Sequence, residues 1–198
     1  MGRPGCGGSM KRVILDLCGG TGSWSAPYRE AGYDVRLVTL PEQDVRTYTP
    51  PPNVHGILAA PPCTEFAVSG ARWWAEKDPL LLWDARRVAN ACLWIISGAK
   101  PKWWALENPI GRFRRFFPEM GEPRLTFDPC DYGDPYRKRT QVWGEFNIPA
   151  KCPVEPDGCR PGQPNAWYSR VGGKSARTKE YRSATPPGFA RAFFEANP

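Results

Sequence analysis

Residues Ile57 to Phe66 read ILAAPPCTEF, an apolar run that stops at two prolines and is followed at once by a cysteine. The apolar run predicts a buried strand, and the prolines cannot continue it. Cys63 is therefore expected just beyond the carboxyl end of a strand, where ligands bind in open α/β sheets. A thiol on a rigid Pro-Pro turn suits a nucleophile. The alternative is a structural cysteine, because free cysteine is usually an inert core residue.

An earlier strand end carries a glycine turn. Val13 to Leu17 is a short apolar run, residues 18–23 read CGGTGS, and a helix is predicted from Trp24 to Ala31. Strand, glycine turn and helix in this order are typical of the nucleotide-binding entry to a Rossmann-like sheet. The Gly20-x-Gly22 pair is only part of the dinucleotide motif, so a plain β–α turn is the alternative.

Two further strands are predicted, over residues 33–40 and 103–106, with a helix between them from an N-cap at Asp84 to about Ser97. The later strand is followed by Glu107 in the run ENP. Glu107 is then expected on the same sheet edge as Cys63. A thiol and a carboxyl at neighbouring strand ends form a candidate catalytic pair. A surface Glu-Asn turn is the alternative.

The remaining segments contain few periodic patterns. Residues 68–82 look like a loop and are a candidate flap over a substrate. Residues 111–117 interleave arginine and phenylalanine, which is typical either of nucleic-acid contact or of a helical turn with its rings in the core. Residues 145–182 are basic and irregular, and predict either an arm that contacts a phosphate backbone or a solvated loop. A last helix is expected over residues 188–196.

Composition limits the class of protein. The chain has 198 residues and a formal net charge of +7, which predicts one domain over residues 10–198 and favours a polyanionic partner. Residues 1–9 are interpreted as a tag-like or disordered lead. No apolar run reaches the roughly 18 residues of a membrane span. The seven cysteines show neither a disulfide framework nor paired zinc-ligand spacing, so we expect no metal and a cytoplasmic location.

In chain order, these motifs resemble those of the cytosine-5 DNA methyltransferases, especially small phage-type members. The resemblance covers roughly residues 13–195 and includes an adenine-binding acid at Asp44, an arginine motif at residues 137–139 and a closing motif at residues 183–187. Cys18 stands where the family usually has phenylalanine, and Thr64 where it has glutamine. The large target-recognition domain is reduced to residues 145–182.

The resemblance implies an α/β, Rossmann-like methyltransferase fold, with a mostly parallel sheet and helices on both faces. It also implies S-adenosylmethionine as cofactor and a flipped or single-stranded cytosine in DNA as substrate. The implied catalytic residues are Cys63 as nucleophile, Glu107 as proton donor to the base, and Arg139 or Arg137 as the contact to the base carbonyl. We expect a monomer. The implied cofactor contacts are Asp16, Cys18, Gly20, Gly22, Trp24, Thr39, Asp44, Val45, Pro61, Ser183 and Thr185.

Other functions stay open on the sequence. The short recognition region permits methylation of RNA or of a free nucleotide. A nucleic-acid-binding protein with a vestigial site is a further alternative, and the Cys63 and Glu107 pair argues against it. Cys18 and the lack of a ribose-binding acid after the second strand permit a modified sulfonium donor, for which the sequence gives no positive indication.

Overall fold

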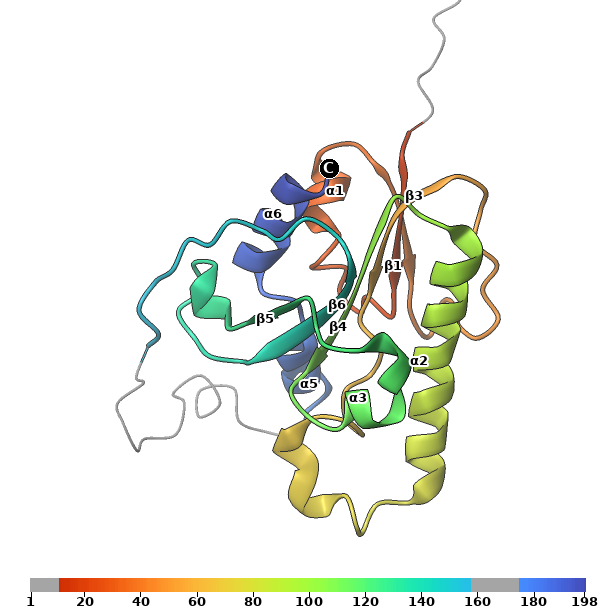
Figure 1. The fold of residues 1–198 in the computed structure, drawn as a ribbon, viewed down its shortest axis with the longest axis vertical. Coiled ribbons are helices and arrows are strands. Elements are labelled where there is room, and N and C mark those ends of the chain that lie inside the picture. Colours follow the sequence, from red (N-terminus) through yellow and green to blue (C-terminus); the bar gives the residue numbers. More distant parts are fainter. Residues whose placement is uncertain (1–10, 158–174) are drawn as a thin grey trace, which may run out of the picture.

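The computed structural model describes residues 11–157 and 175–198 and consists of one twisted sheet with helices packed against it (Figure 1). The six strands lie in the order β2-β1-β3-β4-β6-β5. The strands are β1 (Val13–Leu17), β2 (Asp34–Val38), β3 (Val54–Ala59), β4 (Trp103–Pro109), β5 (Leu125–Phe127) and β6 (Thr140–Glu145). The helices are α1 (Ala26–Glu30), η1 (Val68–Trp73), α2 (Pro79–Ala99), α3 (Phe113–Phe116), η2 (Pro118–Met120), η3 (Pro129–Asp131), α5 (Ala176–Ser183) and α6 (Pro187–Ala196).

The sheet divides into a parallel and an antiparallel part. Strands β2, β1, β3 and β4 are parallel neighbours, whereas β6 runs antiparallel to β4 and β5 antiparallel to β6. Parallel neighbours need a crossover, which α1 and α2 provide. The predicted mostly parallel sheet is confirmed, and the order gives a Rossmann-like arrangement.

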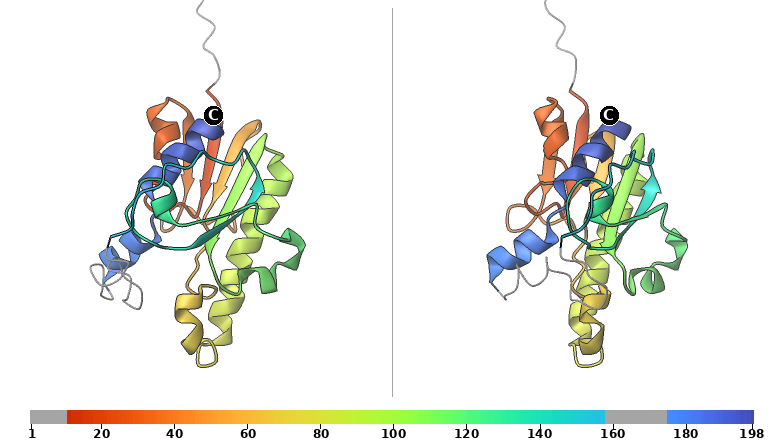
Figure 2. Two further views of the ribbon diagram at one scale, coloured as in Figure 1. Left: turned by 60° about the vertical axis from the view of Figure 1, so that its left-hand side comes forward. Right: turned by 90° about the vertical axis from the view of Figure 1, so that its left-hand side faces the viewer.

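Helices cover both faces of the sheet, as predicted (Figures 1 and 2). Successive side chains of a strand point to opposite faces, so Ile57 packs in one core cluster and its neighbour Leu58 in the other. The Ile57 face is covered by α2 through Ala89 and Cys92. The Leu58 face is covered by α1 and α6, which contribute Tyr28 among other aromatic side chains.

Two local predictions are wrong. Helix α2 begins at Pro79 and not after Asp84, because the Asp78 side chain accepts a hydrogen bond from the Leu80 amide at 2.9 Å and caps the helix there. Part of the predicted loop at 68–82 is therefore helical, and its first half forms η1. Helix α5 forms in a stretch that was expected to be irregular, and Ser175 caps it.

The strand register aligns the carboxyl ends of β1 and β3 with Leu106, inside β4. Ala59 pairs with Leu17 of β1 on one side and with Leu106 of β4 on the other. Cys18, Ala60 and Glu107 therefore follow at the same edge of the sheet, which we call the carboxyl rim. Parallel strands make this edge the usual place for a ligand site. None of the described helices has the length and apolarity needed to cross a membrane.

Candidate active site

The turn that carries Cys63 is held at both ends. Before it, the carbonyl of buried Pro61 accepts a hydrogen bond from Asn108 Nδ2 at 3.1 Å. After it, the Cys63 carbonyl accepts from the amides of Phe66 and Ala67 at 2.9 and 2.8 Å. Proline fixes the backbone between these points. The backbone that carries the thiol is therefore held by the fold before any substrate arrives.

The segment after Cys63 is also bonded to the segment after β4. Arg112 donates from its amide to the Phe66 carbonyl and from Nε to the Glu65 carbonyl, both at 2.8 Å. Gly111 allows this approach, since a Cβ there would overlap the Phe66 carbonyl. Within residues 111–117, Phe113 and Phe117 are about 1% exposed and belong to the core. For these two rings the core alternative is confirmed.

Glu107 lies on β4, one residue beyond the Leu106–Ala59 pair, and its Oε2 atom is shielded from solvent with no hydrogen-bond partner among the described residues. Burial raises the pKa of this carboxyl, and the charge of Lys138 lowers it by less. Such a carboxyl favours its protonated form more than an exposed glutamate does. It can therefore donate a proton to a ligand atom that reaches the rim.

Cys63 and Glu107 are close enough to influence one another. The pKa of the partly exposed Cys63 thiol is raised first by burial and then by the negative charge of Glu107. Lys138 and Arg182 act in the opposite direction and lower the pKa of the same thiol. The structure thus brings the predicted nucleophile and the predicted carboxyl into one electrostatic cluster, with two cations nearby.

The two predicted arginines face a different group. Arg139 Nη1 lies 3.6 Å from Asp128 Oδ2, and its side chain is 64% exposed. The charge of Arg137 also acts on Asp128, since both arginines lower the pKa of that carboxyl against the raising effect of burial. Lys138, between them, was not singled out by the sequence. Because successive side chains of extended backbone point to opposite faces, the sequence could have indicated that Lys138 lies on a different face from its two arginine neighbours.

At the β1 end of the rim, Asp16 lies beneath the glycine turn. It is fully buried, and its Oδ2 accepts a 2.5 Å hydrogen bond from Ser25, whereas Oδ1 has no partner among the described residues. Burial raises its pKa to about 6, with the Ser25 hydrogen bond and the charge of Arg29 acting against that. A Cβ at Gly19 would overlap this carboxyl. The carboxyl therefore supports the turn from below.

The turn itself has the backbone of a ligand cradle. Cys18, Gly20 and Gly22 have φ values of 57°, 54° and 70°, in the left-handed region that glycine adopts readily. Above Gly20 the space is open, because a Cβ there would meet no atom within 4 Å. Ser23 donates to the Thr185 carbonyl at 2.7 Å and ties the turn to the closing motif.

The other predicted cofactor contacts lie in varied surroundings. Trp24 is 2% exposed and packs on Phe193, and Val45 is buried in the core. Half-buried Thr39 accepts from the Gln43 amide through its carbonyl. Exposed Ser183 donates from its hydroxyl to the Glu180 carbonyl at 2.9 Å. Cys18 Sγ lies 3.9 Å from Cys92 Sγ.

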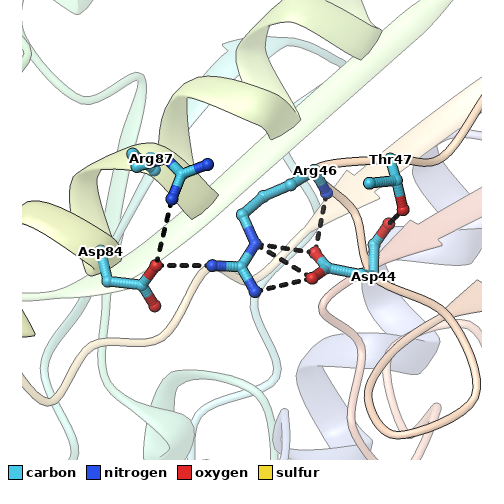
Figure 3. A network of polar contacts seen from close by, with 5 residues as sticks. All are labelled: Asp44, Arg46, Thr47, Asp84 and Arg87. Carbon is cyan, nitrogen blue, oxygen red and sulfur yellow. Dashed lines mark hydrogen bonds and ion pairs between the residues drawn. The ribbon is translucent and has the colours of Figure 1, made fainter.

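Asp44, the predicted adenine-binding acid, belongs to an ion-pair network (Figure 3). Arg46 donates to both of its carboxylate oxygens and to Asp84 on α2. These contacts lower the pKa of Asp44, with the Arg46 side chain as the largest cause. The carboxylate that would meet an adenine amino group is thus already bonded within the protein.

Two predictions concern other parts of the chain. Of the region 145–182, residues 158–174 lie outside the described residues, and residues 176–182 belong to α5. The proposed recognition region is thus described only at its two ends.

Within residues 11–157 and 175–198, no group of three histidine, cysteine or acidic side chains could hold a metal ion.

Comparison with known proteins gives a likeness in fold. No protein-family model and no curated protein matches the chain. One similar solved structure is that of a protein encoded within an E. coli prophage and described as an inferred DNA modification methyltransferase. It is 17% identical in sequence, with a TM-score of 0.52, and the match covers 73% of this chain and 52% of the prophage protein. This chain thus spans about half of that protein's length.

A second solved structure, the Entamoeba histolytica methyltransferase EhMeth, is 12% identical with a TM-score of 0.41, over 85% of this chain and 62% of its own. The prophage likeness and the observed strand order agree on a Rossmann-like methyltransferase fold. At these identities the likeness concerns the fold alone.

Proposed function

We propose that the protein is a DNA cytosine-5 methyltransferase that uses S-adenosylmethionine. The observation that carries this proposal is the pairing of Cys63 with Glu107 at the carboxyl rim, next to the glycine turn of β1. A methyltransferase fold supplies the scaffold, and the description of the prophage neighbour favours DNA among the possible substrates.

The glycine turn fits the amino-acid part of S-adenosylmethionine. The open space above Gly20 and the left-handed backbone at Gly22 leave room for a ligand beside the turn, and the buried Asp16 carboxyl supports the turn from below. Thr185, tied to the turn through Ser23, would complete this side. Asp44 and Val45 would lie near the adenine. When bound, the cofactor supplies an electrophilic methyl group to the base.

Cys63 and Glu107 would act on different atoms of the base. Cys63, as thiolate, adds to carbon 6 of cytosine and forms a carbon–sulfur bond, which moves an electron pair into the ring and makes carbon 5 nucleophilic. Glu107, in its protonated form, gives its proton to N3 and neutralises the charge that this addition creates. After methylation, water takes the carbon 5 proton, the Cys63 thiolate leaves carbon 6, and N3 returns its proton to Glu107, which restores the aromatic ring and the starting enzyme.

The target base must leave the stack to reach the rim. A cytosine inside a duplex does not expose carbon 6 to a thiol held on a turn, so the substrate is flipped or single-stranded. The net charge of +7 favours a polyanion as partner. RNA and free nucleotides are the competing substrates, and a parallel assay on duplex DNA, single-stranded DNA, RNA and dCMP separates them.

The test is a Cys63→Ser variant, compared with Cys152→Ser at an exposed cysteine elsewhere in the chain. Wild type and Cys152→Ser should form 5-methylcytosine in DNA, measured by mass spectrometry of nucleosides, whereas Cys63→Ser should lose activity by about 1,000-fold or more. DNA containing 5-fluorocytosine should trap a denaturation-resistant complex with wild type and with Cys152→Ser, and none with Cys63→Ser. Undiminished methylation by Cys63→Ser overturns the covalent mechanism. Methylation by wild type of none of the four substrates overturns the function.

A further inference from the structure

The β4–β6 ladder assigns Lys138 to one face of the sheet. Glu107 pairs with Val142, and Pro109 pairs with Thr140. Directly opposed residues of an antiparallel pair share a face, and residues two apart along a strand share it as well. The ladder continues beyond the strand, because the Ile110 amide donates to the Arg139 carbonyl at 3.2 Å. Lys138, two residues before Thr140, therefore lies on the Glu107 face.

Arg137 and Arg139 fall on the opposite face by the same alternation. Strand β5 pairs Phe127 with Thr140, which places the next residue, Asp128, beside Arg139, in agreement with their 3.6 Å contact. Exposure follows the alternation, since Arg137 and Arg139 are exposed whereas Lys138 is half-buried. The Thr140 hydroxyl donates to the Lys138 carbonyl at 2.8 Å and holds the backbone in place.

The electrostatic surroundings of Cys63 agree with this geometry. The charged groups that act on the thiol are Glu107 from β4, Lys138 from the segment before β6, and Arg182 from α5. Lys138 lowers the pKa of both Cys63 and Glu107. It is thus shared by the two groups to which the chemistry is assigned.

We propose that Lys138 is the positioning residue that stabilises the Cys63 thiolate, a role distinct from that of the flanking arginines at Asp128. The Lys138 ammonium group acts on the Cys63 thiol, and this effect on the thiolate does not depend on a bound substrate. Its relevance to methyl transfer rests on the function proposed above. Arg182 supports the same thiolate from α5.

The experiment measures alkylation of Cys63 by iodoacetamide from pH 6 to 10, read on the Cys63 peptide by mass spectrometry. Because only the thiolate reacts, Lys138→Met should move the midpoint to higher pH and slow alkylation at pH 7.5 by about three- to tenfold. Lys138→Arg should restore most of the wild-type profile. Arg139→Met, which removes the partner of Asp128, is the matched control and should keep that profile.

The outcomes separate this proposal from the proposed function. A wild-type profile in folded Lys138→Met, or an equal shift in Arg139→Met, overturns the role of Lys138. An alkylation midpoint in Lys138→Arg close to that of wild type supports a charge effect. A midpoint moved as far as in Lys138→Met contradicts it. A wild-type protein that methylates none of the substrates overturns the function and leaves the alkylation result unaffected.

Discussion

Two clusters of polar side chains, one around Asp44 and one around Cys63 and Glu107, are built in opposite ways. In the network of Asp44, Arg46 and Asp84, each acid is matched by the guanidinium at 2.6 and 2.5 Å, and the side chains are 26–50% exposed (Figure 3). In the cluster of Cys63 and Glu107, a carboxyl oxygen is shielded and has no hydrogen-bond partner within residues 11–157 and 175–198. The acids of the first cluster are matched within the protein, whereas the second cluster keeps an unmatched oxygen among these residues.

The difference follows from what each environment does to charge. Exposed ion pairs gain about 0–1 kcal/mol because water competes with them and salt screens them. A buried polar group without a partner costs about 1–3 kcal/mol. A buried carboxyl whose pKa is raised, next to a thiol that it influences, is a candidate for a functional site. The contrast therefore points to the rim, and away from the Asp44 network, as the place of chemistry.

Apart from the loss predicted for Cys63→Ser, the largest expected effect comes from Glu107→Gln, which keeps the shape of the side chain and removes its titrating proton. Methyl transfer should fall by about 100-fold or more, because general acid catalysis contributes about that much. At pH values where Glu107 is ionised in wild type, the variant should also alkylate at Cys63 faster than wild type, since the negative charge that raises the pKa of the thiol is gone. Transfer rates and peptide alkylation check both effects.

The same variant tests stability. The pKa of Glu107 is raised in the folded protein above its ordinary value of 4.5, so its stabilising contribution is complete below pH 4.5 and is lost as the pH rises through the folded pKa. Glu107→Gln should therefore gain stability relative to wild type from pH 4.5 upward in urea titrations. A variant that falls behind wild type across that range contradicts an unpartnered carboxyl.

Asp16→Asn, beneath the glycine turn, should have an intermediate effect, in this case on the pH dependence of the free energy of unfolding. Its folded pKa of about 6, against 3.8 when exposed, means that stability is complete below pH 3.8 and declines until about pH 6. The difference between these two pKa values corresponds to a loss of at most about 3 kcal/mol in the free energy of unfolding. The asparagine oxygen still accepts from Ser25, so the variant should lack this decline. Urea midpoints at pH 4 and 7 check it, and an equal decline in both proteins contradicts it.

Both clusters show how far sequence reasoning reaches. The β3 run before Pro61 and the β4 run before Glu107 are local patterns that predict both strands. The predicted end of β4 at residue 106 is wrong, because pairing with β6 continues the strand through Glu107 to Pro109. The Arg46–Asp84 contact joins residues 38 apart, and no local pattern indicates it. The Asp78 cap was hidden in a loop-like stretch. Trp24 was expected at the cofactor but fills the core against α6, a choice that depends on tertiary packing.

The smallest expected effect comes from Arg46→Gln, which opens the exposed network without touching the rim. We expect a loss of about 0.5–1 kcal/mol in the free energy of unfolding at low salt, and a smaller difference at 0.5 M NaCl, because screening already weakens exposed pairs. The alkylation profile of Cys63 should stay that of wild type. Urea titrations at two salt concentrations check this. A salt-independent loss of several kcal/mol, or a displaced Cys63 profile, would mean that the two clusters are coupled, and the contrast between a complete network and an incomplete site would then fail.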